Sequence, residues 1–174
     1  MQVVPLFSAA EIEARIAELA VRLYRDYADS PVSVLAIAEG ATRFVEALTS
    51  ELARHGVAPE VHSVYARRSG RAPRGAVQVD AFDPSVLDGR DVLLVVDVVG
   101  EGAKLAAVLE VVGMAETRSV RTASLIGKRA RRREGVDPDY TVFEVDGGWI
   151  VGFGMGGDGE LRDLDEIGRL LDDS

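Results

Sequence analysis

The sequence predicts an α/β fold with one mainly parallel, twisted sheet of about five strands and helices on both of its faces. The first reason is that short apolar runs rich in β-branched residues alternate with longer stretches whose apolar residues follow helical spacing. The second is the run 91–99, which is apolar at seven of nine positions and therefore typical of a strand buried on both faces. A length of 174 residues suits a single domain spanning 1–174.

Composition narrows the classes of protein to which this chain can belong. Apolar residues make up 47% and charged residues 28% of the chain, which is typical of a globular protein. No run approaches the ~18 apolar residues of a membrane helix. The absence of Cys excludes disulfides and thiolate metal ligands. We therefore expect a cytoplasmic protein with no membrane partner.

The net charge of −9 is unevenly distributed. Residues 65–75 contain four Arg and no acidic residue, and residues 128–133 contain five basic residues and no acidic one. The rest of the chain has 11 basic against 29 acidic residues, a net charge of −18. Two cationic segments on an acidic body predict a local site for a small anion, and they make nucleic acid an unfavourable partner.

The first third of the chain predicts a helix, a strand and a second helix. Ser8 and Glu11 form a capping box, and apolar residues at helical spacing continue from there to about Ala28. The apolar run 32–38 predicts a buried strand. The stretch 41–55 then predicts the second helix.

The middle of the chain predicts two strands around an arginine-rich loop. A third strand begins in 57–66, and 76–82 would return beside it. The glycines of the connecting segment 67–75 suit a mobile hairpin. His55 and His62 lie on different predicted elements, so we predict no metal site from them.

The run 91–99 is followed by Gly100 and Gly102, which open a tight turn, and by a predicted helix over 103–109. A strand, a glycine turn and a helix in this order direct backbone N–H groups at an anionic ligand. Farther along the chain, the pattern predicts buried strands at 119–126 and 140–145 and a short C-terminal helical face formed by Leu164, Ile167 and Leu170.

The segment from Asp91 to Leu105 resembles the phosphoribosyl-pyrophosphate loop of type I phosphoribosyltransferases, in the hypoxanthine-guanine branch. In that branch two acidic residues end the strand, two apolar residues follow, and an Asp-(Ser/Thr)-Gly-x-Thr turn begins. Asp97 and Gly102 match this pattern. The family's Glu, catalytic Asp, Ser/Thr and final Thr fall on Val96, Gly100, Glu101 and Lys104.

The resemblance extends over about 8–170. Lys128 matches the Lys that donates to the exocyclic oxygen of the purine in the family. Trp149 and Ile150 fall where an aromatic ring stacks on the purine and the following backbone group reads the base edge. Arg162 matches an Arg that contacts pyrophosphate.

A short loop that helps to hold pyrophosphate keeps its glycine at Gly40, but Glu39 stands where the family has Lys or Arg. Gly156 stands where an Asp of the family contacts the metal. The resemblance also implies a small hood, built from the N-terminal segment and about 140–165, and a homo-oligomer, either a dimer or a tetramer.

These substitutions predict a weakened transferase. Gly100 has no acid/base group, a loss of typically ~10²–10⁴ in rate, and Val96 and Gly156 remove contacts to the ribose and the metal. Glu101 would repel the 5′-phosphate, whereas Lys104 either neutralises Glu101 or binds an anion itself. Among the family's catalytic positions, only Asp97 and Glu101 remain as acidic remnants.

We therefore expect a purine phosphoribosyltransferase homologue, catalytically impaired or repurposed, that binds a purine base, a nucleotide or another small anion. The expected ligand-binding residues are Gly40, Gly102, Lys104, Lys128, Trp149, Ile150 and Arg162. One alternative is an active purine phosphoribosyltransferase in which Glu101 is the acid/base and Lys104 replaces a metal; we expect Mg²⁺ as a cofactor only if the chain is active. A second alternative is an RNA- or polyphosphate-binding module that uses the arginine-rich segments 67–74 and 128–133.

Overall fold

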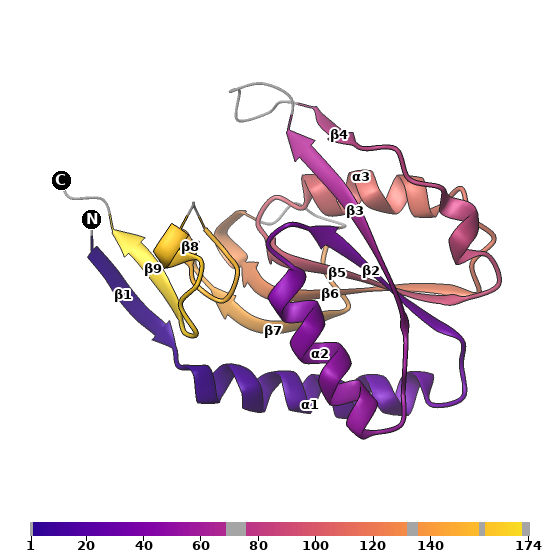
Figure 1. The fold of residues 1–174 in the computed structure, drawn as a ribbon. Coiled ribbons are helices and arrows are strands. Elements are labelled where there is room, and N and C mark those ends of the chain that lie inside the picture. Colours follow the sequence, from indigo (N-terminus) through magenta and orange to yellow (C-terminus); the bar gives the residue numbers. More distant parts are fainter. Residues whose placement is uncertain (1, 69–75, 132–135, 157–158, 172–174) are drawn as a thin grey trace.

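The computed structural model describes residues 2–68, 76–131, 136–156 and 159–171. In these residues the main sheet has six strands, one more than the sequence predicts, in the order β4-β3-β2-β5-β6-β7 (Figure 1). Their bounds are Val77–Val79 for β4, Glu60–Arg68 for β3, Val32–Ala38 for β2, Asp91–Val99 for β5, Ser119–Lys128 for β6 and Tyr140–Val145 for β7.

The predicted central strand forms β5 with the predicted bounds, and it lies between β2 and β6. Its pairing with both neighbours is parallel, and Asp91 is level with Val32 on one side and Ser119 on the other. Parallel strands that begin level also end close together, so the turns that follow them meet at one edge of the sheet. Among the described strands of the main sheet, β4 alone runs antiparallel to its neighbour, β3.

Three helices cover the two faces of the main sheet (Figure 1). Helices α1 (Ala9–Tyr27) and α2 (Thr42–Arg54) pack on one face, where Leu93 and Val95 of β5 join their core. Helix α3 (Ala103–Val112) packs on the other face against Leu94 and Val96. This alternation along β5 explains why almost the whole strand is apolar. The capping box of Ser8 and Glu11 is present as predicted.

A second, smaller sheet forms the hood, in the order β1-β9-β8. Its strands are β1 (Gln2–Phe7), β9 (Ile167–Leu171) and β8 (Trp149–Val151). The predicted C-terminal helical face is therefore wrong, because residues 167–171 pair antiparallel with β1 and β8. The hood prediction was also partly wrong, since 140–145 belongs to the main sheet as β7.

Several predicted bounds differ from the structure. The third strand begins at Glu60 and not at position 57, and the returning strand is limited to Val77–Val79. The helix predicted over 103–109 continues to Val112. Residues 69–75 of the predicted arginine-rich loop and 132–133 of the second basic segment lie outside the described residues. Short 3-10 turns occur at Pro84–Leu87, Arg129–Arg131 and Gly159–Leu161.

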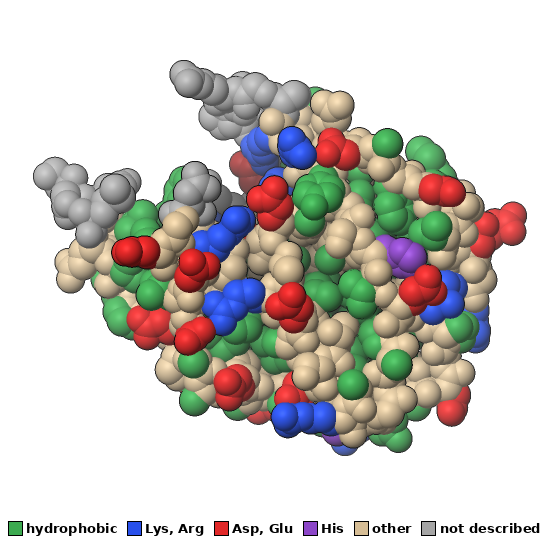
Figure 2. All heavy atoms as spheres, in the orientation of Figure 1, with side chains coloured by type: hydrophobic (Ala, Val, Ile, Leu, Met, Phe, Trp, Pro, Cys, Tyr) green, Lys and Arg blue, Asp and Glu red, His purple; other side chains and the backbone are tan. Residues whose placement is uncertain are grey.

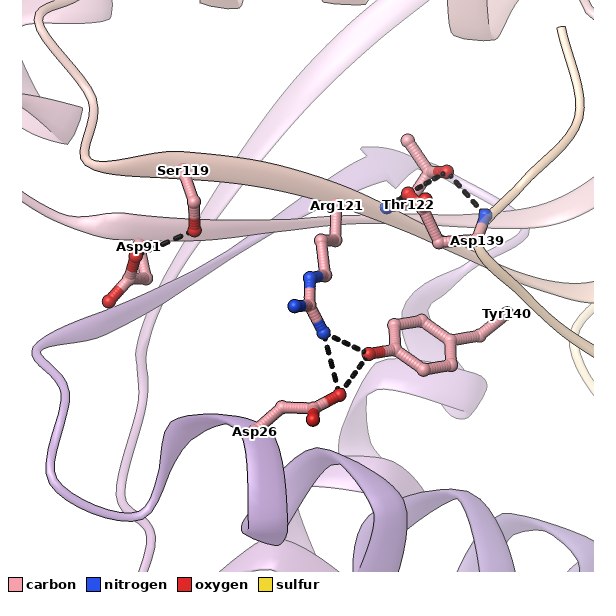
Figure 3. Close-up of polar contacts among 7 residues, drawn as sticks. All are labelled: Asp26, Asp91, Ser119, Arg121, Thr122, Asp139 and Tyr140. Atoms are coloured by element: carbon pink, nitrogen blue, oxygen red, sulfur yellow. Dashed lines mark hydrogen bonds and ion pairs between the residues drawn. The ribbon is translucent and has the colours of Figure 1, made fainter.

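A polar cluster ties the end of α1 to the main sheet at the edge where the parallel strands begin (Figure 3). Asp26 accepts hydrogen bonds from Arg121 Nη1 at 2.6 Å and from the Tyr140 hydroxyl. We call these three residues the α1 anchor. Nearby, Ser119 Oγ donates to Asp91 Oδ1 at 2.6 Å. Among the helices of the described segments, none has the length and apolar character needed to span a bilayer.

Candidate functional site

Three adjoining hollows form a cleft at the edge where the parallel strands end. The helix hollow, about 420 Å³, lies around the turn between β5 and α3, and the loop hollow, about 440 Å³, lies around the turn after β2. The hood hollow, about 240 Å³, lies beside β8. Figure 2 shows acidic and basic side chains intermingled on the face between the hood and the main sheet. Open parallel sheets bind their ligands at this edge.

Asp97, near the end of β5, borders all three hollows. Its Oδ1 accepts a hydrogen bond from the backbone N–H of Val98 at 2.7 Å. Burial raises the pKa of the Asp97 carboxyl, and the Val98 N–H and the positive charges of Lys104 and Lys128 oppose that rise. Asp97 is therefore a carboxylate that all three hollows share, with two lysines close enough to oppose the effect of its burial.

Gly40 lies directly against this carboxylate. A Cβ atom at position 40 would be 1.9 Å from Asp97 Oδ2, so the close approach requires glycine. The peptide bond between Ala38 and Glu39 in the same turn is cis. Glycine at this position thus has a structural reason in addition to the role that the resemblance implies.

The hood hollow combines three of the predicted ligand-binding residues. Lys128 comes from the end of β6, and Trp149 and Ile150 come from β8. The Trp149 side chain is 61% exposed, whereas Ile150 is buried. An exposed aromatic side chain next to a cation is suited to contact with a planar, oxygen-bearing ring.

The helix hollow is lined by the turn that carries Gly100, Glu101 and Gly102. Gly102 has φ +79° and is the N-terminal cap of α3, so its backbone conformation favours glycine. Arg68 Nη2, at the end of β3, donates to Glu101 Oε2 at 3.4 Å. The sequence left open whether Lys104 neutralises Glu101 or binds an anion itself, and in the structure an arginine on β3 contacts Glu101.

The loop hollow contains a second ion pair across the cleft, between Arg162 and Glu39. Arg162 Nε donates to the carbonyl oxygen of Gly154 at 3.1 Å, and its Nη2 lies 3.7 Å from Glu39 Oε2. Glu39 is the position where the resemblance showed a reversed charge. Lys104 borders this hollow as well as the helix hollow.

The structure thus places all seven predicted ligand-binding residues on one cleft, and their roles stay predictions. Lys128 and Trp149 share a hollow, whereas Arg162 borders the adjoining one, which meets it at Asp97 and Gly156. The sequence did not identify Arg68 as a partner of Glu101. The signal that could have found it is topological, because β3 and β5 are both neighbours of β2 and run parallel to it.

No described group of three or more His, Cys, Asp or Glu side chains has an arrangement that could hold a metal ion. Asp97 is the carboxylate shared by the three hollows, and the positive charges of Lys104 and Lys128 act to lower its pKa. Positions 96 and 156 carry Val and Gly. Neither of these two positions offers a carboxylate to a Mg²⁺ ion, which would therefore have Asp97 and the phosphates of a ligand among its nearest acidic partners.

Most of this chain is similar to proteins of one known family. Residues 6–156 match the family model of the phosphoribosyl transferase domain. A hypoxanthine-guanine phosphoribosyltransferase from Mycobacterium avium is 32% identical, over 95% of this chain and 84% of that protein. One from Streptococcus thermophilus is 27% identical, over 97% of this chain and 93% of that protein.

Solved structures agree with the sequence comparisons. A hypoxanthine phosphoribosyltransferase from Staphylococcus aureus superposes with a TM-score of 0.88 at 21% identity, covering 97% of this chain and 91% of that chain. The Trypanosoma cruzi enzyme in complex with the product IMP superposes with a TM-score of 0.87 at 25% identity, covering 96% and 93%. The predicted resemblance is confirmed, and the chain belongs to the phosphoribosyl transferase family, in its hypoxanthine-guanine branch.

Proposed function

We propose that this chain is a purine-binding member of its family in which phosphoribosyl transfer is impaired. The observation that carries the proposal is the contrast between two parts of one cleft. Lys128 and Trp149, which match the purine-contacting positions of the family, border the same hollow. The position of the family's catalytic Asp is Gly100, which has no side chain to move a proton.

The environment of the replaced positions supports the same conclusion. The side chain of Val96 is buried in the core beneath α3, so it is part of the packing on that face. Glu101 brings a carboxylate to the turn where a phosphate would have to approach, and like charges repel there. When bound, a metal would neutralise the charge of a diphosphate, and Gly156 offers it no carboxylate.

The ligand we propose is a purine base or nucleotide in the hood hollow. Trp149 would stack on the ring, and Lys128 would donate to a ring oxygen. Stacking of a base on an aromatic side chain contributes roughly 1–3 kcal/mol, so micromolar affinity also needs the charged contact. Because the chain has one Trp, its fluorescence reports on this hollow alone.

The test is a titration of Trp149 fluorescence with hypoxanthine, guanine, xanthine, adenine, IMP and GMP. We expect quenching by at least one purine, and Lys128→Ala should weaken binding by about tenfold or more. Arg129→Ala is the matched control, since the Arg129 side chain pairs with Glu144 and lies outside the three hollows. If millimolar purines change neither the fluorescence nor the melting temperature, the proposal is wrong.

An active purine phosphoribosyltransferase is the alternative, and one observation favours it. Lys104 borders both the helix hollow and the loop hollow beside Asp97, a place from which a cation could neutralise a diphosphate in place of a metal. Pyrophosphate release from phosphoribosyl pyrophosphate, with each purine and with or without Mg²⁺, separates the two functions. We expect no release above background, and turnover of about 1 s⁻¹ or more would establish the alternative.

A further inference from the structure

The turn between β5 and α3 carries a negative charge, that of Glu101, and a negative charge opposes the binding of a phosphate. Glu101 directly precedes Gly102, the N-terminal cap of α3, and its side chain lines the helix hollow. The N-terminus of a helix of ten residues, such as α3, attracts anions through its backbone N–H groups. In this chain the carboxylate of Glu101 lies beside the N-terminus of α3.

Arg68 holds this carboxylate across the cleft. Its Nη2 atom lies 3.4 Å from Glu101 Oε2, and the two side chains are 32% and 35% exposed. The partly buried contact joins the end of β3 to the turn before α3. A guanidinium at a strand end beside a helix N-terminus could bind a phosphate group. In this structure the Arg68 guanidinium contacts the Glu101 carboxylate instead.

The turn after β2 shows the same arrangement. Glu39 Oε2 faces Arg162 Nη2 at 3.7 Å in the loop hollow. The Glu39 side chain is 67% exposed, so solvent screens this pair more than the pair in the helix hollow. Two turns at the same edge of the sheet therefore each present a glutamate that faces an arginine.

We propose that Glu101 makes this cleft select unphosphorylated purines, that is bases or nucleosides, over nucleotides. The inference rests on the proposed purine-binding function and names its ligand class. A phosphate near α3 would have to approach the Glu101 carboxylate and compete with it for Arg68. Glu39 adds a smaller effect of the same sign in the loop hollow. The ring contacts proposed for Lys128 and Trp149 lie in the hood hollow, whose lining contains neither glutamate.

The test compares guanine, guanosine, GMP and inorganic pyrophosphate on the wild type and on single variants. Binding of the purines is followed by Trp149 fluorescence, and binding of pyrophosphate by calorimetry and by the shift in melting temperature. Glu101→Gln removes the charge and keeps the shape. Glu110→Gln makes the same change at an exposed position near the other end of α3 and is the matched control.

In the wild type we expect GMP to bind more weakly than guanine or guanosine. Glu101→Gln should raise the affinity for GMP and for pyrophosphate at least tenfold and leave the affinity for guanine unchanged. The reason is that removing the repulsion between two close charges in a partly screened cleft changes an affinity by about that factor. Arg68→Gln should have the opposite effect on GMP, since it leaves the carboxylate and removes the guanidinium. Glu110→Gln should match the wild type in every titration.

Two outcomes would overturn the inference, and both differ from a failure of the proposed function. One is that the wild type binds GMP at least as tightly as guanine. The other is that Glu101→Gln leaves GMP and pyrophosphate unchanged or weakens them. If none of the purines binds to any variant, the proposed function fails, and the pyrophosphate titrations alone then decide whether Glu101 excludes phosphates.

Discussion

Restoring the family's carboxylate at position 156 should destabilise this chain. Gly156 has φ +77°, and a Cβ atom there would lie 2.6 Å from Val151 Cγ1 and 2.8 Å from the carbonyl oxygen of Ile150. A left-handed conformation costs an L-residue roughly 1–2 kcal/mol, and relief of an overpacked contact costs about 1–3 kcal/mol. We therefore expect Gly156→Asp to lower the free energy of unfolding by about 2–5 kcal/mol.

The assay is urea unfolding followed by far-ultraviolet circular dichroism. Gly100→Asp is the control, because it adds the same side chain at a position whose Cβ would meet nothing within 4 Å. It should change the free energy of unfolding by less than about 0.5 kcal/mol. Gly156→Ala should show most of the same decrease in unfolding free energy, since the Cβ atom alone is close enough to clash with Val151. An unfolding midpoint of Gly156→Asp equal to that of the wild type would refute this reasoning.

Three further substitutions test the packing and charges around the cleft and the sheet. Gly40→Ala should lower the free energy of unfolding by about 1–3 kcal/mol in urea, because its Cβ would lie 1.9 Å from Asp97 Oδ2. Burial raises the pKa of the Asp97 carboxyl, so the folded state binds more protons than the unfolded state just above the ordinary carboxyl pKa, and stability falls as pH rises through that window. Asp97→Asn should therefore equal or exceed the wild-type melting temperature at neutral pH, and the difference should shrink on acidification; a variant that melts lower at neutral pH contradicts this. Asp26→Asn removes the charge from the partly exposed α1 anchor and should cost about 0.5–1.5 kcal/mol of unfolding free energy, whereas Asp29→Asn, at a neighbouring exposed position, should unfold like the wild type.

The main sheet could be predicted because its signals are local. The run 91–99 is apolar at seven of nine positions, contains no glycine or proline, and is followed by a glycine turn. The structure places β5 on those residues. The helix that begins after Ser8 carries its own capping box, so its start is also encoded in neighbouring residues. Strands and helices of this kind need no knowledge of their distant partners.

The hood could not be predicted in the same way. Strand β9 is five residues long, and its antiparallel pairing with β1 joins the two ends of the chain, so no nearby residue signals it. Gly168 packs against β1, where a Cβ would lie 2.5 Å from Val3 Cγ1. The apolar spacing of Leu164, Ile167 and Leu170 suits a helix, but tertiary pairing decides the structure of so short an element.

The candidate site shows the same limit at the level of side chains. The types and positions of the cleft residues could be predicted from the family pattern, yet the partner of Glu101 could not. Sequence proximity suggested Lys104, which lies three residues away, whereas Arg68 lies 33 residues away and reaches Glu101 only through the sheet topology. Ion pairs across a cleft depend on which strand ends meet, and that is a property of the whole fold.

The replaced family positions fall into two physical kinds. At Gly100, Gly156 and Val96 a carboxylate is absent: the space beside Gly100 is open, neighbouring atoms crowd Gly156, and Val96 is part of the apolar core. At Glu39 and Glu101 a carboxylate is present, and each faces an arginine across the cleft. Absent groups lower a rate, but an added charge changes which ligands can enter, because it repels anions that the neighbouring arginines would otherwise attract. A cleft changed in both ways, with Lys128 and Trp149 bordering the hood hollow, is the basis of our proposal that this site binds the purine ring and disfavours its phosphates.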